Sequence, residues 1–189
     1  IMDYPISGGF DIYRTERERD EDGGFAYNQR TVGGGLRFGK TFTEFVSAGK
    51  YYRFEEVEID NLADNVSADL EAERGINRVS LLGLNLTRDA RDSTINPTKG
   101  LFVNGNVEVA GGPLSGTKDF YRTQGRASYY VPLKYKSVLE FRGRLGFVDA
   151  YGDSDKVPIF ERFFAGGAKS IRGYNERAVG PLDVNTEDP

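Results

Sequence analysis

Cysteine, histidine and tryptophan are all absent from the 189 residues of this chain. Without cysteine, neither a disulfide framework nor a thiolate metal site can form, which suits a protein of the cell envelope. Without histidine, the usual general base, the Ser-His-Asp triad and most zinc sites are excluded. These absences weigh against a hydrolase or a metalloenzyme.

Long apolar runs and an excess of positive charge are also missing. No stretch of about 18 apolar residues occurs, so the sequence predicts no membrane-spanning helix. The formal net charge of -4 provides no basic surface, and we expect no nucleic-acid partner. The opening residues do not have the pattern expected of a signal peptide, and the abrupt ends lead us to expect an excised fragment or a mature segment.

Apolar and polar residues alternate with a period of two in seven segments, which turn-forming residues separate. This period predicts antiparallel β-strands with one apolar and one polar face. In the clearest strand, Leu139 and Phe141 alternate with Glu140 and Arg142. Lys50 is the flaw in the pattern, because it falls on an apolar side. The predicted strands are residues 5–14, 27–39, 43–57, 76–87, 101–110, 119–131 and 137–148.

Two classes of all-β protein fit this alternation. A transmembrane β-barrel has lipid on one side of its sheet and water on the other, whereas a soluble sheet covers its apolar face with protein. Strands of about ten residues favour the barrel. So do the connections, because long charged ones at 15–26 and 58–74 alternate with short ones at 39–42 and 132–136.

Other candidate sites have simpler explanations. The acidic patches at 18–22 and 55–60 lack the spacing of a calcium-binding loop, and we interpret them as solvated charge. Glu55 and Glu56 are neighbours on one predicted strand, so they point to opposite faces and cannot act as a catalytic pair. Tyr129 is predicted to lie in the aromatic girdle at a membrane interface. The residues therefore predict no catalytic and no metal site.

The segment from Phe163 to Tyr174 reads FFAGGAKSIRGY. On its residues alone it is either a glycine-rich hairpin tip or a loop packed tightly against a wall, since both use the positive φ of glycine. The segment resembles the sixth extracellular loop of the outer-membrane translocase superfamily, the BamA-type barrels. In that family the loop folds back into the barrel lumen, and its arginine docks on the inner wall. The resemblance implies functional roles for Gly166, Gly167, Ser170, Ile171, Arg172, Gly173 and Tyr174.

A second motif runs from Thr87 to Gly100 and reads TRDARDSTINPTKG. It resembles the Asp-x-Arg-Asp…Pro-x-x-Gly turn of the same barrels. The residues alone indicate a charged turn, in which Asn-Pro and Lys-Gly pairs reverse the chain. We expect this motif to serve structure by joining two strands on the periplasmic side. Its residues are Arg88, Asp89, Arg91, Asp92, Pro97 and Gly100.

The resemblance covers essentially the whole chain and implies an all-β, antiparallel transmembrane β-barrel that is partial. Residues 1–150 are expected to form about seven of sixteen strands, namely the fifth to the eleventh. Residues 151–189 are expected to form the first part of the sixth extracellular loop. The acidic partner of Arg172 is expected in later strands, outside this chain.

The function implied by the resemblance is non-enzymatic: the insertion and folding of β-barrel proteins in the bacterial outer membrane. The implied partners are unfolded outer-membrane β-barrel proteins, accessory lipoproteins of an assembly complex and outer-membrane lipid. No nucleotide, metal or other cofactor is implied. Two alternatives stay open. One is a TamA-like or two-partner-secretion translocator of the same superfamily, and the other is a soluble all-β binding module.

Overall fold

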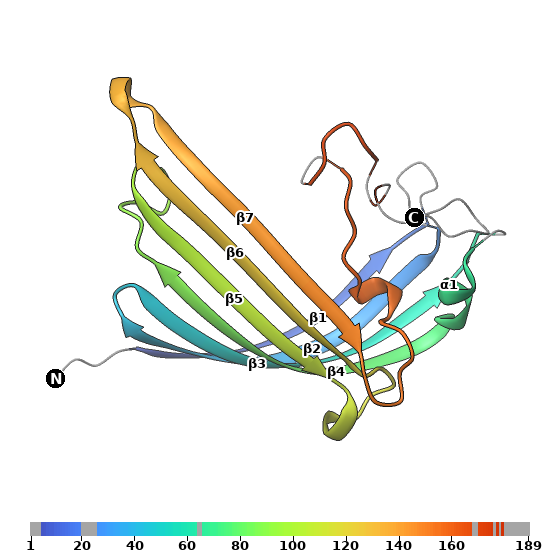
Figure 1. Cartoon of the computed structure of the whole chain (residues 1–189). Helices are drawn as coiled ribbons and strands as arrows, with labels where there is room; N and C mark the ends of the chain where they lie inside the picture. The colour runs from blue at the N-terminus through green and yellow to red at the C-terminus, as the bar shows by residue number, and fades with distance from the viewer. Residues whose placement is uncertain are drawn as a thin grey trace.

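The computed structural model describes residues 5–19, 26–63, 66–167 and 170–175, together with residues 177 and 179. Seven strands form one antiparallel sheet in which each strand pairs with the next along the chain. They are β1 (Ile6–Arg17), β2 (Asn28–Thr43), β3 (Val46–Asp60), β4 (Gly75–Asp89), β5 (Gly100–Ala110), β6 (Phe120–Pro132) and β7 (Val138–Ala150). The helical pieces are α1 (Ala68–Ala72) and the 3-10 turns η1 (Gly112–Leu114), η2 (Lys134–Lys136) and η3 (Ile159–Glu161). The sheet curves into an open trough (Figure 1).

All seven predicted strands are confirmed, but the predicted turn at residues 39–42 is wrong. Strand β2 continues to Thr43, and the turn consists of residues 44 and 45. Gly39 pairs with Ser7 of β1 on one side and with Gly49 of β3 on the other. Ladder hydrogen bonds on both edges thus outweigh the preference of Gly39-Lys40 for a turn.

The connections lie at opposite ends of the sheet, as the sequence predicts. The connections after β1, β3, β5 and β7 lie at one end of the sheet, and those after β2, β4 and β6 lie at the other. The turns after β2 and β6 are short, whereas the connection after β4, residues 90–99, is as long as the one after β1 and longer than the one after β5. Helix α1 lies in the long connection after β3 and was not predicted. Its N-cap is Ser67, whose hydroxyl accepts a hydrogen bond from the backbone N–H of Leu70 at 3.3 Å. This cap satisfies an N–H group that has no partner within the helix.

The two faces of the sheet differ in the way that the alternation predicts. Large apolar side chains cover the convex face, and Ile12 and Leu145 are 84% and 85% exposed there. Polar and charged side chains line the concave face, apart from the buried apolar clusters near the long connections. Lys50 lies on the convex side, with its ammonium group 5.9 Å from the ring centroid of Phe38. Its long apolar stem makes this placement tolerable.

The buried core lies on the concave side, near the long connections. Residues 151–165, which follow β7, turn back over this side (Figure 1). Phe160 of this segment packs against both clusters of buried residues. One cluster comprises Tyr27, Val57, Ile59 and Leu70, and the other comprises Val79, Leu81, Ala110 and Phe120. None of the helices in the described part of the chain has the length and apolar character needed to cross a membrane.

Candidate docking site on the concave wall

The segment after β7 is fixed to the concave wall through Glu161. This residue ends η3 and is 7% exposed. Its carboxylate accepts a hydrogen bond from Nη2 of Arg53 at 3.1 Å and another from Nη1 of Arg122. Arg53 belongs to β3 and Arg122 to β6, so one carboxylate bridges two strands that are not neighbours.

Each of these arginines also has a carboxylate partner on the wall itself. Arg122 Nε donates a hydrogen bond to Glu108 of β5. Arg53 Nε lies 3.3 Å from Oε2 of Glu55, without hydrogen-bond geometry. We call these four wall residues together with Glu161 the anchor cluster. It brings two guanidinium groups and three carboxylates together on a largely buried surface.

Two tyrosines complete the hydrogen bonding of the wall carboxylates. The hydroxyl of Tyr13 donates to Glu55, and that of Tyr51 donates to Glu108. The ring of Tyr51 lies across Gly83 of β4, where a Cβ would come within 2.2 Å of the ring. The wall carboxylates thus have both a cation and a hydroxyl donor, as buried charges require.

Burial governs the electrostatics of Glu161. It raises the pKa of this carboxyl above its usual range, while Arg122 and Arg53 lower the pKa by less. Removal from water disfavours the charged form of a carboxyl group, and the guanidinium groups offset only part of this cost. Glu161 therefore fixes the position of the segment by pairing with the two arginines, but it adds little net stability.

Apolar contacts hold the same segment on either side of Glu161. Pro158 is fully buried, and Phe160 packs against both core clusters. The ring of Phe163 lies over Gly146 of β7, where a Cβ would come within 2.8 Å of it. The docked segment therefore combines a central ionic contact with apolar burial.

A second ionic contact joins the segment to α1. Lys156 Nζ lies 2.6 Å from Oδ1 of Asp69, and Arg162 Nη2 lies 3.0 Å from its Oδ2. The hydrogen bond from Lys156 and that from Arg162 hold the pKa of the Asp69 carboxyl below its usual range. Because these groups are partly exposed, the contact adds little to stability, but it fixes where α1 lies.

Five residues of the predicted loop motif form a compact turn. The φ angles of Gly166, Gly167 and Gly173 are 116°, 82° and 92°, which only glycine adopts readily. The hydroxyl of Ser170 donates to the carbonyl of Gly166 at 2.5 Å and accepts from its N–H at 2.8 Å. The N–H of Gly167 donates to the carbonyl of Tyr174 at 3.0 Å.

The other two motif residues, Ile171 and Arg172, are exposed at the end of this turn. The polar contacts found among the described residues do not include one from Arg172, and its docking on a wall stays a prediction. Arg177 does make contacts, since its guanidinium lies 3.6 Å from the ring centroid of Phe164 and donates to the hydroxyl of Tyr27 at 3.3 Å.

Sequence reasoning missed Glu161 as a docking residue. Its partners Arg53 and Arg122 lie 108 and 39 residues away in the sequence. No local pattern marks such a pairing, because one glutamate before an arginine also suits a solvated loop. The charged residues on the polar side of the predicted strands were the available signal, since they require buried partners wherever the wall is covered.

The predicted turn motif joins β4 to β5. Arg91 forms two hydrogen bonds with Asp89, of 2.8 and 2.7 Å. Asp92 accepts hydrogen bonds from the backbone N–H groups of Thr98 and Lys99, of 2.9 and 3.1 Å. At Gly100 the φ angle is 111°, and a Cβ would come within 2.2 Å of a carbonyl oxygen. The charged residues therefore hold the shape of the turn.

The remaining two turn-motif residues make fewer contacts. Arg88 pairs in the ladder with Val103 on the convex side, and Pro97 lies in the turn itself. Both positions suit the structural role that we expect for this motif.

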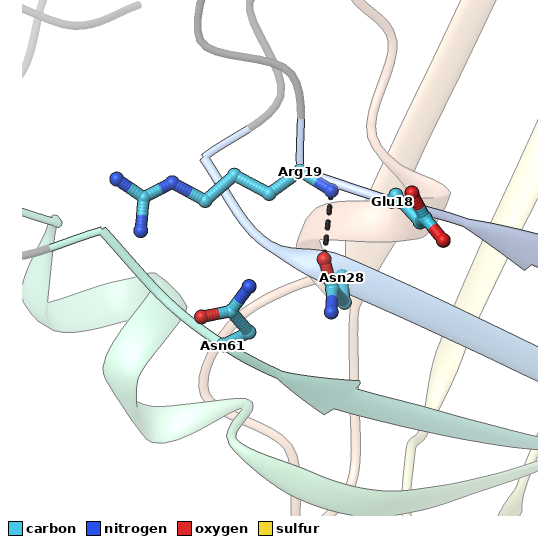
Figure 2. A pocket seen from close by; sticks show the side chains of 4 residues that line it. All are labelled: Glu18, Arg19, Asn28 and Asn61. Carbon is cyan, nitrogen blue, oxygen red and sulfur yellow. Dashed lines mark hydrogen bonds between the residues drawn. The ribbon is translucent and has the colours of Figure 1, made fainter.

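A polar hollow near the long connections offers no chemistry (Figure 2). Glu18, Arg19, Asn28 and Asn61 line it, and the side-chain oxygen of Asn28 accepts a hydrogen bond from the backbone N–H of Arg19 at 2.7 Å. Two amides, one guanidinium and one carboxylate do not form a nucleophile and base pair. The described residues also contain no group of three or more side chains suited to hold a metal ion.

A one-piece antiparallel sheet with an apolar convex face, a polar concave face and a docked segment defines a β-barrel wall. A family model described as the Omp85 superfamily domain matches residues 1–188, and the chain belongs to this superfamily. The predicted resemblance to the outer-membrane translocase superfamily is confirmed.

Relatives of known name are similar along much of the chain. "Outer membrane protein assembly factor BamA" of Nitratidesulfovibrio vulgaris is 35% identical over 188 residues, which are 100% of this chain and 23% of that protein. A SAM50-like protein of Schizosaccharomyces pombe is 30% identical over 129 residues, or 67% of this chain and 27% of that protein. The chain thus spans about a quarter of the length of these relatives.

A solved structure shows the same fold. The crystal structure of BamA from Haemophilus ducreyi lacking POTRA domains 1-3 matches with a TM-score of 0.81 at 18% identity. The match covers 93% of this chain and 36% of that one. The predicted fold class, a partial antiparallel transmembrane barrel, is confirmed, and the chain is a segment of an integral outer-membrane protein.

Proposed function

We propose that this chain is part of a barrel that inserts and folds β-barrel proteins in the outer membrane without catalysing a chemical reaction. The observation that carries the proposal is the division of one continuous sheet into an apolar convex face and a polar concave face on which the chain's own segment is seated. The assembly factors among the relatives support this function.

In this proposal, residues 1–150 are the fifth to the eleventh strands of the barrel, and residues 151–189 are the first part of its sixth extracellular loop. Unfolded outer-membrane β-barrel proteins are the substrates, and accessory lipoproteins and outer-membrane lipid are partners. A substrate strand pairs with an open edge of the barrel, as in other strand additions. Burial of apolar strands in lipid and completion of their backbone hydrogen bonds supply the free energy, so no nucleotide is needed.

The two alternatives differ from this proposal in testable ways. A soluble binding module is disfavoured by the convex face, since side chains such as Ile12 and Leu145 are left almost fully exposed. A translocator of the same superfamily has the same wall but a different cargo. Loss of the parent protein therefore distinguishes the two functions. Loss of an assembly factor lowers folded barrels in the membrane, whereas loss of a translocator lowers an exported protein in the medium.

The test uses the full-length parent protein. Cells depleted of the parent receive either the unchanged gene or one encoding Arg172→Ala, and the folded fraction of several unrelated outer-membrane barrels is measured by heat-modifiable gel mobility. We expect depletion to lower folded barrels generally. We expect Arg172→Ala to lower them about tenfold, because the predicted docking of this guanidinium on the barrel wall would be lost and a factor of ten corresponds to about 1.4 kcal/mol.

Arg74→Ala is the matched control, since Arg74 is an exposed arginine whose ion pair among the described residues is with Glu71, which is also exposed. It should leave barrel assembly unchanged. Normal levels of all barrels, combined with failed secretion of a single exported protein, would contradict the assembly function and establish the translocator.

A further inference from the structure

We infer that Glu161 is the positioning residue that seats the segment after β7 on the barrel wall, and that the wall is built to release it. The inference deepens the proposed function, because it specifies how the segment is held. It differs from the predicted role of Arg172. Glu161 is acidic where Arg172 is basic, and its partners lie on β3 and β6, whereas the partner of Arg172 is expected in later strands.

The first support is that the wall is charge-balanced without the segment. Arg53 faces Glu55, and Arg122 faces Glu108, within the wall itself. When Glu161 leaves, neither arginine is left as an unpaired charge. An ion pair whose loss leaves such a charge is strongly destabilising to break, and this wall avoids that penalty.

The second support is the desolvation cost of burying the Glu161 carboxylate. The carboxylate is 7% exposed and joins a cluster that already holds two other carboxylates. Burial therefore offsets much of the attraction to the two arginines. A contact of this kind specifies position and does so without locking the segment permanently in place.

The third support is the bridging geometry. Glu161 accepts from one strand at 3.1 Å and from a second strand that lies three positions further along the sheet. Phe160 and Phe163, on either side of it, pack on apolar wall sites. An apolar segment alone could shift along the wall. Two fixed guanidinium groups can both donate hydrogen bonds to the carboxylate in only one position.

The experiment replaces Glu161 with lysine in the full-length parent protein in membranes. Chymotrypsin cleavage after Phe160, Phe163 and Phe164 reports release of the segment, and heat-modifiable mobility reports that the barrel is folded. A third cation beside two arginines repels them, so we expect cleavage to rise more than about tenfold while the barrel stays folded.

Asp155→Lys is the matched control, because it makes the same change of charge at an exposed position of the same segment. It should be cleaved like the parent. A purely structural role for position 161 predicts no rescue by a second charge change. The double variant Glu161→Lys with Arg53→Glu restores the net charge of the anchor cluster, and we expect it to recover at least half of the protection.

Three results would overturn the inference: unchanged cleavage in Glu161→Lys, equal cleavage in Asp155→Lys, or no recovery in the double variant. An unfolded Glu161→Lys barrel would also count against it, because the wall would then need Glu161 to be stable. Cleavage is read without reference to assembly activity. A failed assembly function therefore leaves this result standing, and a failed anchor leaves the assembly test standing.

Discussion

Gly83 shows how a single missing side chain shapes the concave wall. The ring of Tyr51 occupies the space that a Cβ at this position would take, within 2.2 Å. From there the tyrosine hydroxyl reaches Glu108 in the anchor cluster. The glycine is thus needed for close approach and not for an unusual backbone angle.

Replacing Gly83 with alanine should therefore displace Tyr51 and weaken the wall. We expect a loss of about 1–3 kcal/mol in the free energy of unfolding, the usual range for overpacking. The measurement is urea unfolding of the full-length parent in lipid vesicles. Gly105→Ala is the control, because nothing lies within 4 Å of a Cβ at that position. Equal losses in both variants would show that chain flexibility, and not Tyr51, sets the effect.

The residue scale is also where sequence reasoning reaches its limit. Alternation identifies Arg122 as a residue of the polar face, but it does not identify Glu161 as its partner, because that pairing depends on how the segment after β7 folds back. The prediction for Arg172 rests on a resemblance and stays a prediction. Charge on a buried wall can be predicted locally, whereas its partner is a property of the whole fold.

Among the elements, the turn between β4 and β5 is the one whose shape is held most directly by its charged residues. Asp92 accepts hydrogen bonds from the hydroxyl of Thr98 and from two backbone N–H groups. These bonds, that from the Thr98 hydroxyl first, lower the pKa of Asp92 to about 2. A carboxylate that is bonded in this way closes the turn on itself.

The pH dependence of this turn follows from the lowered pKa. The stabilisation by ionised Asp92 is fully present above the ordinary pKa of 3.8 and is lost as the pH falls through about 2. Hydrogen exchange of residues 90–99 in the full-length parent should therefore show the same protection factors at pH 7 and at pH 4. In Asp92→Asn we expect lower protection at pH 7 as well.

The control for this prediction is Glu44→Gln, which neutralises an exposed carboxylate in the short turn after β2. It should not change protection in either turn. Protection of residues 90–99 that is already lost between pH 7 and pH 4, or that survives unchanged in Asp92→Asn, would remove Asp92 from this role.

The strands were predictable because lipid or water on each face enforces a period of two along every strand. Their ends were less predictable, as the continuation of β2 through Gly39 to Thr43 shows. Helix α1 could not be predicted, because its five residues are held by Leu70 in a core cluster and by Asp69 through distant cations. Short elements of this kind depend on tertiary contacts more than on propensity.

At the scale of the whole molecule, the convex face is an apolar band with a charged edge. Near the long connections, Arg30 lies 2.9 Å from Glu16 and 3.5 Å from Glu58, and Arg78 lies 3.1 Å from Glu56. These exposed pairs contribute little stability. They indicate where the convex face leaves the lipid, since charged pairs are excluded from the hydrocarbon region.

Leu36 of β2 lies on the convex face, four residues along the strand from Val32 and two from Phe38. Arginine there should face the hydrocarbon region, and we expect Leu36→Arg to lower the free energy of unfolding in vesicles by about 2–4 kcal/mol. The adjacent residue is already an arginine. Arg37 faces the concave side and lies 2.8 Å from Asp11, so the same side chain is tolerated one position away.

Ser47→Arg is the control for this prediction, since Ser47 of β3 lies on the concave side between Thr41 and Thr87 in the ladder. It should change the free energy of unfolding by less than about 0.5 kcal/mol, because Ser47 is only partly buried and a long arginine side chain there can keep its guanidinium in water. The exchange variant Leu36→Arg with Arg37→Leu keeps the composition and inverts both faces, so its loss should exceed that of Leu36→Arg alone. Equal losses in Leu36→Arg and Ser47→Arg would mean that water reaches both faces, and the convex face would then not be the lipid-facing side of a barrel.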